Sequence, residues 1–481
     1  MTGNATTPLW TAREAAAATG GMAIGDWAAR GVSIDTRTLV ENDLFVAISG
    51  PNFDGQTFAE EALNKGAAAV VVHDGGSIEL PERAPRLVVG ETTIALRSLG
   101  RAARGRTDAR IVAVTGSVGK TGTKEALRLA LSAQGKVTAT TGNLNNHWGL
   151  PLSLARMPAD TAYGVFELGM SAPGELEPLS RMTRPHVAII TAIAEVHSAY
   201  FDSLDGISDA KAEIFSGLEP GGTAILNRDD AKYERLAAQA EDRGITNIIS
   251  FGAHAAADYR LLDCELRYAG SDVIAECKGE TIEYRVGIPG RHWVTNSLAV
   301  LAAVQALGAD VAKAAAELVK MDALTGRGKQ SVVSLGAGDF VVIDESYNAS
   351  PVSMAAAIEV LGQGRMPEKG RRVAVLGDML ELGPKSEALH AELADVLIKQ
   401  HVDVVFTAGQ YMSALWDALP PQMRGGHACT AKKLSPMVSA SVRAGDVVMV
   451  KGSLGSQTGQ IVNALLETDA PAGPRRAANG E

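Results

Sequence analysis

Short runs of apolar, often β-branched residues alternate with alanine-rich stretches along most of the chain. The runs have the length of buried strands, and the stretches between them have the length of helices. This alternation predicts an α/β protein. Several runs end in Gly, Asp or Glu, where sheets of this class present their binding loops. The predicted strands are 67–73, 110–116, 163–169, 186–193, 222–227, 340–346, 371–378, 403–409 and 446–452.

Changes in local composition and residue pattern divide the chain into three blocks and a tail. A length of 481 residues favours about two to four domains. The first block, 1–107, closes in the arginine-rich "RAARGRTDAR", and the second spans 108–325. "TGRGKQ" (325–330) is typical of a hinge and leads into the third block, 326–467. The Pro/Gly/Ala-rich tail, 468–481, is expected to be disordered.

Charge and cysteine usage narrow the class of protein. A net charge of −10 argues against a broad nucleic-acid surface, which needs clustered Lys and Arg, but it allows a phosphorylated ligand. The 3 cysteines have no metal-ligand spacing and suit a reducing cytosol. The N-terminus lacks the pattern of a signal peptide, and "HVAIITAIAEVH" is too short to cross a bilayer. We therefore expect a cytoplasmic protein without a transmembrane segment, and a monomer.

The stretch "VTGSVGKTGTKEAL" (114–127) resembles a phosphate-binding loop with one glycine out of place. The usual pattern, G-x-x-x-x-G-K-[ST], would put its first glycine at Val114, whereas the chain has Gly116. A predicted strand precedes the stretch and a predicted helix follows it, so free N–H groups at the helix start can meet an anion. Lys120 can then reach the outer phosphates, and the Thr121 hydroxyl can bind Mg²⁺. The alternative is a strand-to-helix turn with an exposed lysine.

Three residues downstream have side chains suited to a metal site. Glu167 ends one predicted strand, His197 follows another, and Lys211 lies on a predicted helix. Each alone is weak evidence, since many strands end in an acid, a lone histidine is more often structural, and a helical lysine is usually solvated.

Two polar clusters follow predicted strands or precede helices. The first is in "TTGNLNNHWGLPLSL" (140–154), where a capping loop is the alternative to a polar ligand site. The second is in "IDESYNASP", directly after a predicted strand. The residues concerned are Asn143, Asn145 and Asn146 in the first cluster, and Asp344, Tyr347 and Asn348 in the second.

Taken in order, these motifs resemble the Mur ligases of peptidoglycan synthesis. The matching segments are "TGSVGKT", "TGNLNN.WGLP", "FELGMS", "DAKAEIF", "GRH..TN" and "YNASP", and they cover nearly the whole chain. That family uses a shortened loop, T-G-[ST]-x-G-K-[ST], as the chain has at 115–121. The resemblance implies three α/β domains: a small N-terminal domain for a uridine nucleotide, a central P-loop ATPase domain with a mainly parallel sheet, and a C-terminal Rossmann-like domain.

The resemblance also implies roles for individual residues. Lys120 and the loop would bind ATP, with Lys211 carried as a carbamate that helps to hold Mg²⁺, for which two ions are expected. The implied ATP contacts are Thr115, Gly116, Ser117, Gly119, Lys120, Thr121, Asn296, Arg327, Asp344, Tyr347 and Asn348. The implied metal ligands are Thr121, Glu167, His197 and Lys211, and with Lys120 the last three form the catalytic set. The implied substrate contacts are Ser33, Thr36, Arg37, the backbone near Phe45 to Ala47, Asn143, Asn145 and Asn146.

Within the family, the two ends of the chain indicate which step is catalysed. The first block resembles a uridine-nucleotide domain of the later ligases and lacks the glycine fingerprint of the early ones. The motif "DNPR" of the diaminopimelate-adding ligase is absent, whereas "VLGDMLELG" (375–383), followed by His390, resembles the ligase that adds D-alanyl-D-alanine to UDP-N-acetylmuramoyl-tripeptide. Two alternatives stay open: another amide ligase of the superfamily, diaminopimelate-adding or folylpolyglutamate-type, and a non-catalytic nucleotide-binding or wall-precursor-binding protein.

Several positions depart from the family's usual pattern. Trp148 stands in place of a small aliphatic residue, Trp293 in place of Asn, and Gln56 in place of His. Gln457 replaces an arginine in "KGSLGSQ", and "HSAYFDS" differs from the usual "HLE.FGS". These departures concern the substrate contacts more than the ATP chemistry.

Overall fold

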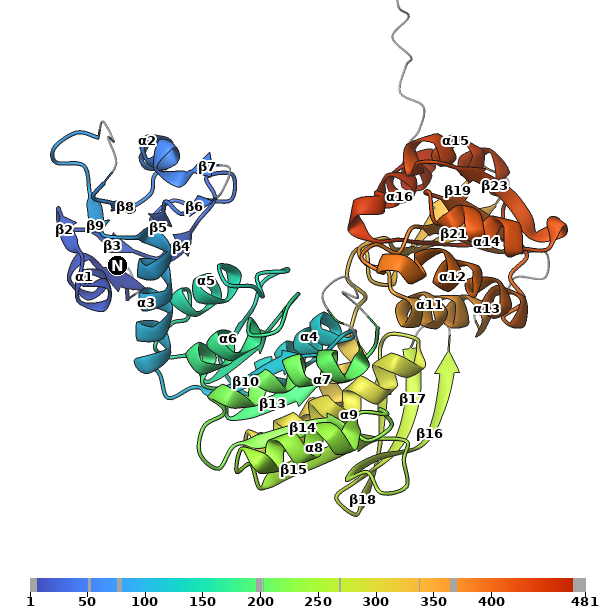
Figure 1. Ribbon diagram of the computed structural model, residues 1–481, viewed down its shortest axis with the longest axis horizontal. Coiled ribbons are helices and arrows are strands. Elements are labelled where there is room, and N and C mark those ends of the chain that lie inside the picture. The colour runs from blue at the N-terminus through green and yellow to red at the C-terminus, as the bar shows by residue number, and fades with distance from the viewer. Residues whose placement is uncertain are drawn as a thin grey trace, which may run out of the picture.

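A computed structural model of the chain has three α/β domains in a row, the central one between two outer ones (Figure 1). The structure describes residues 7–50, 53–75, 80–195, 201, 203–267, 270–336, 338–363 and 370–469. The main sheets of the three domains take their strands from residues 22–89, 110–286 and 329–451. The predicted boundaries near 107 and 325 lie in the connections between these sheets.

The N-terminal domain holds a five-stranded sheet in the order β2-β9-β8-β5-β4. Helices α1 and α3 pack on one face of this sheet, and α2 packs on the other. The strands are β1 (Trp10–Thr11), β2 (Met22–Ile24), β3 (Ala28–Ala29), β4 (Gly31–Ser33), β5 (Asp43–Val46), β6 (Ser49–Gly50), β7 (Phe53–Asp54), β8 (Ala69–His73) and β9 (Arg86–Val89). The helices are α1 (Ala12–Thr19), η1 (Gly55–Phe58), α2 (Ala59–Asn64) and α3 (Thr92–Gly105).

The central domain holds a nine-stranded sheet in the order β11-β12-β10-β13-β14-β15-β16-β17-β18. Its strands are parallel from β11 to β16, and the last three form an antiparallel ribbon. The strands are β10 (Arg110–Thr115), β11 (Val137–Ala139), β12 (Tyr163–Glu167), β13 (Val187–Ile190), β14 (Thr223–Asn227), β15 (Asn247–Gly252), β16 (Tyr259–Arg267), β17 (Gly270–Cys277) and β18 (Glu280–Val286).

Helices cover both faces of the central sheet. Helices α4, α9 and α10 pack on one face, and α5, α6, α7 and α8 pack on the other. They are α4 (Lys120–Ser132), α5 (Gly149–Ala155), α6 (Leu176–Thr183), α7 (Leu204–Ala212), η2 (Glu213–Gly217), α8 (Tyr233–Asp242), α9 (Arg291–Ala306), α10 (Val311–Glu317) and η3 (Leu318–Lys320).

The C-terminal domain holds a six-stranded sheet in the order β19-β20-β24-β21-β22-β23. Helices α11 to α14 cover one face, and α15 and α16 cover the other. The strands are β19 (Lys329–Ser334), β20 (Asp339–Glu345), β21 (Arg372–Gly377), β22 (Val404–Ala408), β23 (Arg424–Ala428) and β24 (Val447–Lys451). The helices are α11 (Pro351–Gln363), η4 (Gly383–Lys385), α12 (Ser386–Ala391), α13 (Leu393–Lys399), α14 (Met412–Ala418), η5 (Pro421–Met423), α15 (Ala431–Ser441), η6 (Leu454–Ser456), α16 (Gly459–Leu466) and η7 (Glu467–Asp469).

The N-terminal and central domains share a hydrophobic core. Leu152 and Ala155 of α5 belong to the buried cluster of the N-terminal domain, and Trp148 packs against it. The Trp10 indole N–H donates to the Ala155 carbonyl oxygen (2.9 Å), and Arg156 Nε donates to the Val32 carbonyl oxygen (2.6 Å). Trp148, a departure from the family pattern, therefore fills the junction between these two domains.

Every strand predicted from the sequence is present, displaced or shortened by a few residues at its ends. The pattern missed the antiparallel ribbon β16 to β18 and the short strands of the N-terminal domain. The predicted tail lies outside the described residues from 470 onward, and its first two residues belong to η7. Within the described ranges, no helix is both long enough and apolar enough to cross a bilayer.

Candidate active site

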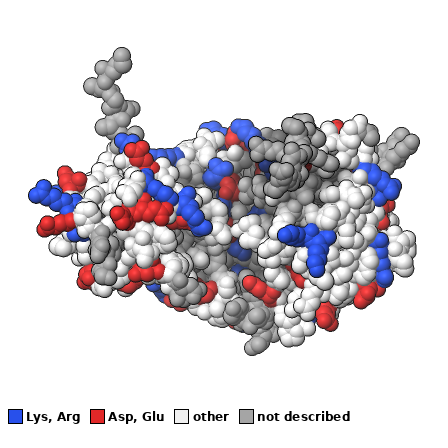
Figure 2. Space-filling view, turned by 90° about the horizontal axis from the view of Figure 1, so that it is seen from above, with Lys and Arg blue, Asp and Glu red and all other residues white. Residues whose placement is uncertain are grey.

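The loop after β10 lies where the central sheet changes its direction of winding. β10 pairs with β12 on one side and with β13 on the other. The helix that follows β10, α4, covers one face of the sheet, whereas α6, which follows β12, covers the opposite face. Such a point opens a crevice at the carboxyl ends of the strands, where α/β proteins bind ligands. Figure 2, which looks down on the molecule of Figure 1, shows the surface hollowed between the two outer domains.

Two glycines give this loop a shape that other residues rarely adopt. Gly116 and Gly119 have φ values of +146° and +84°. A Cβ atom on Gly116 would lie 2.0 Å from Oγ1 of Thr191, which follows β13 and donates to the carbonyl oxygen of Val118. Helix α4 starts directly after Gly119 without a side-chain cap, so its first N–H groups are open to an anion. The loop therefore has the geometry of a phosphate site.

Lys120 folds back on its own loop. Its ammonium group donates to the carbonyl oxygens of Gly116 (2.6 Å) and Ser117 (3.3 Å), and it forms no ion pair with a carboxylate of the described residues. Burial lowers the pKa of Lys120, Glu167 opposes that shift, and the charge of Arg327 adds to it. The Thr121 side chain is buried beside it in the first turn of α4.

Glu167 ends β12 next to the loop and is nearly fully buried, at 2% exposure. Its Oε1 accepts a hydrogen bond from Asn145 Nδ2 at 2.8 Å. Its Oε2 is buried and has no hydrogen-bond partner among the described residues. A buried carboxylate oxygen without a partner is costly, and a bound cation would remove that cost.

Lys211, on α7, is 1% exposed. Burial lowers its pKa well below the ordinary value, and the charge of Lys120 lowers it further, while Glu213 opposes both. Lys211 and Lys120 therefore lie in one electrostatic environment, although α7 and α4 cover opposite faces of the sheet. His197, the other predicted metal ligand, lies outside the described residues.

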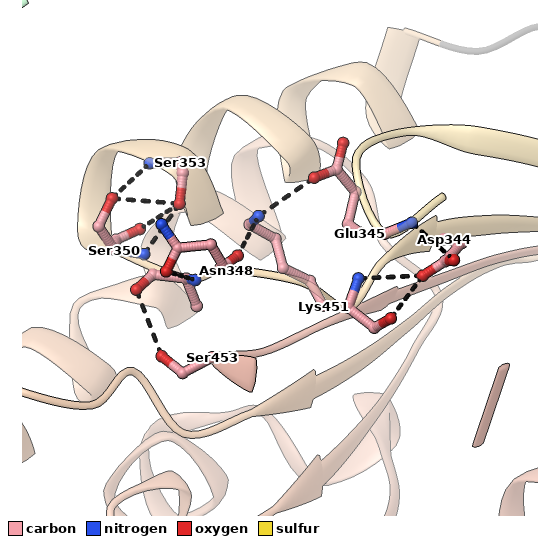
Figure 3. Close-up of polar contacts among 10 residues, drawn as sticks. Asp344, Glu345, Asn348, Ser350, Ser353, Lys451 and Ser453 are labelled. Carbon is pink, nitrogen blue, oxygen red and sulfur yellow. Dashed lines mark hydrogen bonds and ion pairs between the residues drawn. The ribbon is translucent and has the colours of Figure 1, made fainter. Parts of the chain in front are cut away.

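The C-terminal domain contributes a second set of predicted residues. The Arg327 guanidinium stacks on the Tyr347 ring, 4.5 Å from its centroid. Asp344 Oδ2 accepts from the N–H of Gly326 (2.8 Å), so this carboxylate holds the predicted hinge against β20. Asn348 lies in the loop between β20 and α11, and Figure 3 shows it beside Lys451.

Sequence reasoning missed Lys451, which ends β24 and is 3% exposed. Its ammonium group pairs with Glu345 Oε2 (3.2 Å) and donates to the Asn348 carbonyl oxygen (2.9 Å), as Figure 3 shows. The sequence signal that could have indicated Lys451 is its position at the end of an unbroken apolar run. Nearby, the hydroxyl of Thr458 is buried and has no partner in the described part of the chain.

His390 has a structural role in this domain. Its Nε2 accepts from the N–H of Met379 (2.9 Å), and its Nδ1 bonds the Ser386 carbonyl oxygen (2.6 Å). Burial lowers the pKa of His390, against opposing effects of Ser386 and Asp378. The buried ring therefore fixes the loop that carries "GDMLELG".

The remaining predicted substrate residues are spread over two domains. Asn146 accepts from the N–H groups of Trp148 and Gly149 at the start of α5, so it caps this helix, whereas Asn143 is exposed. In the N-terminal domain, Ser33 is buried and Thr36 is half-buried, while Arg37 is exposed and pairs with Asp35. The side chains of Phe45 and Ala47 belong to the core, and the Ala47 N–H donates to the Val71 carbonyl oxygen (3.0 Å).

Gln56, another departure from the family pattern, contacts both the backbone and the side chain of His73. Its Oε1 accepts from the N–H of His73 (3.1 Å), and its Nε2 contacts His73 Nε2. Gln457 adopts a left-handed conformation, with φ of +58°, and its Oε1 accepts from Gln460 Nε2 (2.9 Å).

The start of α9 packs against the loop and the first turn of α4, on the same face of the sheet. A Cβ atom on Gly119 would lie 2.7 Å from Asn296 Nδ2, so this predicted ATP contact touches the loop directly. Trp293, one turn earlier on the same helix, lies against Gly122. The structure thus brings together the loop, Glu167, Asn145 and Asn296.

Comparisons with known proteins indicate the family to which a chain with this site belongs. Three family models match the chain: the catalytic domain of the Mur ligase family at residues 29–104, the Mur ligase middle domain at 114–304, and the Mur ligase glutamate ligase domain at 330–454. The chain belongs to the Mur ligase family.

Relatives of this Mur ligase span nearly its whole length. It is 35% identical to the UDP-N-acetylmuramoyl-tripeptide–D-alanyl-D-alanine ligase of Bacillus subtilis, over 91% of this chain and 93% of the relative. The enzyme of the same name from Escherichia coli is 34% identical over the same shares. Among solved structures, MurF of Acinetobacter baumannii is 28% identical with a TM-score of 0.82, over 95% of this chain and 99% of that one. MurF of Thermotoga maritima, solved in complex with ADP, is 26% identical with a TM-score of 0.74, over 91% and 97%.

The side chains at the phosphate loop of this Mur ligase supply some of the oxygen ligands that a divalent cation needs. The described residues hold no group of three His, Cys, Asp or Glu side chains that could bind a metal. Glu167 Oε2, which has no partner among the residues that the structure describes, and the buried Thr121 hydroxyl are hard oxygen donors of the kind that Mg²⁺ prefers. Lys211 becomes a further oxygen donor only if its amine is converted to an anion.

Proposed function

We propose that this protein is the ATP-dependent ligase that joins D-alanyl-D-alanine to UDP-N-acetylmuramoyl-tripeptide in peptidoglycan synthesis. One observation carries the proposal: a phosphate-type loop meets, at one crevice, a buried Glu167 oxygen that has no hydrogen-bond partner in the described part of the chain. They do so in a chain that matches ligases of this name over nine-tenths of its length.

ATP binds with its phosphates on the loop from Gly116 to Thr121. The loop N–H groups, the start of α4 and Lys120 supply positive charge to the phosphates. Asn296 and the stacked pair of Arg327 and Tyr347 lie toward the adenosine end. This assignment is supported by the ADP complex of the Thermotoga maritima structure, which shares the fold.

The reaction proceeds in two transfers. The terminal carboxylate of the tripeptide attacks the γ-phosphate, which gives an acyl phosphate and releases ADP. The amine of D-alanyl-D-alanine then attacks the acyl carbon, phosphate leaves with the bonding pair, and the amine loses a proton. Lys120 and the helix start stabilise the charge of the transferring phosphoryl group. The crevice between domains limits hydrolysis of the acyl phosphate.

Glu167, Thr121, His197 and a carbamate on Lys211 hold Mg²⁺, for which two ions are proposed. Mg²⁺ supplies charge neutralisation for the phosphates when it is bound. Burial and the nearby Lys120 favour the neutral amine of Lys211, which is the form that adds to CO₂ and releases one proton. The product carries an anion in place of a neutral amine beside the Lys120 cation, so the conversion adds an attraction within the site.

The uridine end of the substrate binds the N-terminal domain, at Ser33, Thr36, Arg37 and the backbone from Phe45 to Ala47. The tripeptide end reaches the loop of Asn143, Asn145 and Asn146. The core shared by the N-terminal and central domains supports this path, because it fixes the distance between the two ends of one long substrate.

Purified protein supplied with ATP, Mg²⁺, UDP-N-acetylmuramoyl-tripeptide and one candidate amine at a time tests the proposal. We expect phosphate release and a pentapeptide product, identified by mass spectrometry, only with D-alanyl-D-alanine. Turnover with diaminopimelate or glutamate instead would assign the chain to another ligase of the superfamily. Nucleotide binding without turnover of any amine would favour a binding protein.

A further inference from the structure

Two helices that meet at the phosphate loop fit together through an unusual pair of residues. Gly122 lies in the first turn of α4, two residues after Lys120. A Cβ atom built on Gly122 would lie 2.3 Å from Cζ3 and 2.5 Å from Cη2 of Trp293 on α9. Non-bonded carbon atoms settle at about 3.5–4.0 Å. The benzo edge of the indole therefore occupies the space that any side chain at position 122 would need.

The next turn of α9 touches the loop on the other side of Lys120. Asn296 follows Trp293 by three residues, so both side chains project from one face of the helix. Asn296 Nδ2 would lie 2.7 Å from a Cβ atom on Gly119. The two glycines that flank Lys120 are thus each in contact with a side chain of α9, and these contacts set the position of the loop backbone.

Trp293 is suited to act as a fixed reference for the loop. Its indole is half-buried and packs against the core that α4, α9 and the central sheet share. Its backbone N–H donates to the Gly290 carbonyl oxygen (3.0 Å) at the start of the helix. A tryptophan has only two side-chain torsions, so this packing leaves the ring little freedom.

We propose that Trp293 is a positioning residue for nucleotide binding, matched to the missing side chain of Gly122. Its indole holds the first turn of α4 where the loop N–H groups and Lys120 meet the phosphates. This inference rests on the proposed ATP site, and nothing in it requires Trp293 to touch the nucleotide. Overpacking at this contact displaces α4 or the indole, because a packed core transmits such a shift to its neighbours.

ADP affinity, measured by calorimetry on the full chain, tests the pair. G122A crowds the indole and is expected to weaken ADP binding about tenfold. W293F removes the benzo edge that meets position 122, so G122A/W293F is expected to recover to within about threefold of the wild type. The matched controls are G105A, at the last residue of α3 with open space around it, and W416F in the C-terminal domain. Neither control should change ADP affinity.

Two further readouts separate positioning from loss of structure. G122A should raise the KM for ATP while the KM for the UDP-linked substrate and the melting temperature of the protein stay near wild type. ADP should also change the tryptophan fluorescence of the wild type and of W416F, and this change should be lost in W293F.

Recovery of ADP affinity in the double variant supports the proposal. Wild-type affinity in G122A, or a double variant no better than G122A at equal melting temperature, overturns it. If G122A does not fold, W293A is measured in its place. An unchanged ADP affinity in W293A would likewise overturn the proposal. A wild-type protein that binds no ADP would overturn the proposed function as well, so the two failures are distinguishable.

Discussion

The central and C-terminal domains each place a lysine at the point where a parallel sheet changes direction, but they use its charge differently. Lys120 follows β10 and has no carboxylate partner among the described residues. Lys451 ends β24, between β20 and β21, and is paired with Glu345. The helix after β24 packs on one face and the helices after β20 and β21 on the other, so the topology of the two crevices is alike.

The difference lies in which polar groups are already satisfied within the protein. At the central crevice, as far as the structure describes it, Lys120 bonds only its own loop and Glu167 keeps a buried oxygen without a partner. At the C-terminal crevice Lys451, Asn348 and Glu345 satisfy one another (Figure 3). A folded chain tolerates an unmet buried group where a ligand meets it. Among the described residues, the central crevice therefore has charged groups that a ligand could meet, whereas the charge of the C-terminal lysine is already paired at its own sheet edge.

Replacing Lys120 should give the largest effect. K120A removes the mobile positive charge that the loop offers to the phosphates, and we expect ligation to fall about a thousandfold. Phosphate release in the presence of all three substrates measures the loss. The melting temperature should hardly change, because the Lys120 ammonium group hydrogen-bonds only to its own loop within the described ranges. ADP release at the normal rate by K120A would remove Lys120 from the mechanism.

Lys211 sharpens the contrast, because burial and the charge of Lys120 lower its pKa and so disfavour its cation. K211A should lower the rate of ligation about a hundredfold through loss of a metal-binding anion. Formate or acetate should restore part of the activity, whereas excess bicarbonate should not. In the wild type, ¹³C-labelled CO₂ should give a carbamate signal that K211A lacks. Full activity of K211A would eliminate the carboxylate role.

The sequence predicted the fold where the strands are buried on both faces. Such strands appear as unbroken apolar runs, and β10, β12 and β13 were found for this reason. The ribbon of β16 to β18 was missed because its strands alternate between buried and exposed positions, and a short alternating pattern is easily lost among polar residues.

Only those parts of the candidate site that lie within a single segment of the sequence were predictable. Glu167 ends an apolar run and Lys120 follows the loop after another, so their placement at one sheet edge could be anticipated. The pairing of Lys451 with Glu345 depends on β20 and β24 being neighbours, although β21 to β23 separate them in the sequence. The contact between Trp293 and Gly122 likewise joins two distant segments, and no local sequence pattern predicts it.

Breaking the Lys451 pair should cost stability more than it costs nucleotide chemistry. K451M leaves the Glu345 carboxylate without its partner. We expect the C-terminal domain to lose about 2 kcal/mol, less than for a fully buried pair because Glu345 keeps some solvent contact. Trp416 is the single tryptophan of that domain, so its fluorescence during urea unfolding reports the loss. K451M/E345Q should regain most of it. A K451M protein as stable as the wild type would contradict the structural role of the pair.

The smallest effect is expected at the opposite edge of the central sheet, where His186 precedes β13 and its Nδ1 accepts from the N–H of Ile111 (3.0 Å). Burial, with the charges of Arg110 and Arg104, lowers the pKa of His186 from 6.5 to about 4, and Glu219 opposes the shift. The unfolded chain therefore binds a proton before the folded one does, so stability falls as the pH drops from 6.5 through 4.

The half-buried ring limits this loss to about 1 kcal/mol. H186N keeps an acceptor without titrating, and its stability measured by chemical denaturation at pH values on either side of that window should fall less than that of the wild type. Other acids titrate in both proteins, so the difference in slope isolates His186. Equal slopes would mean that the amino-terminal edge carries no such group. Unequal slopes would show that His186 contributes to stability at this edge.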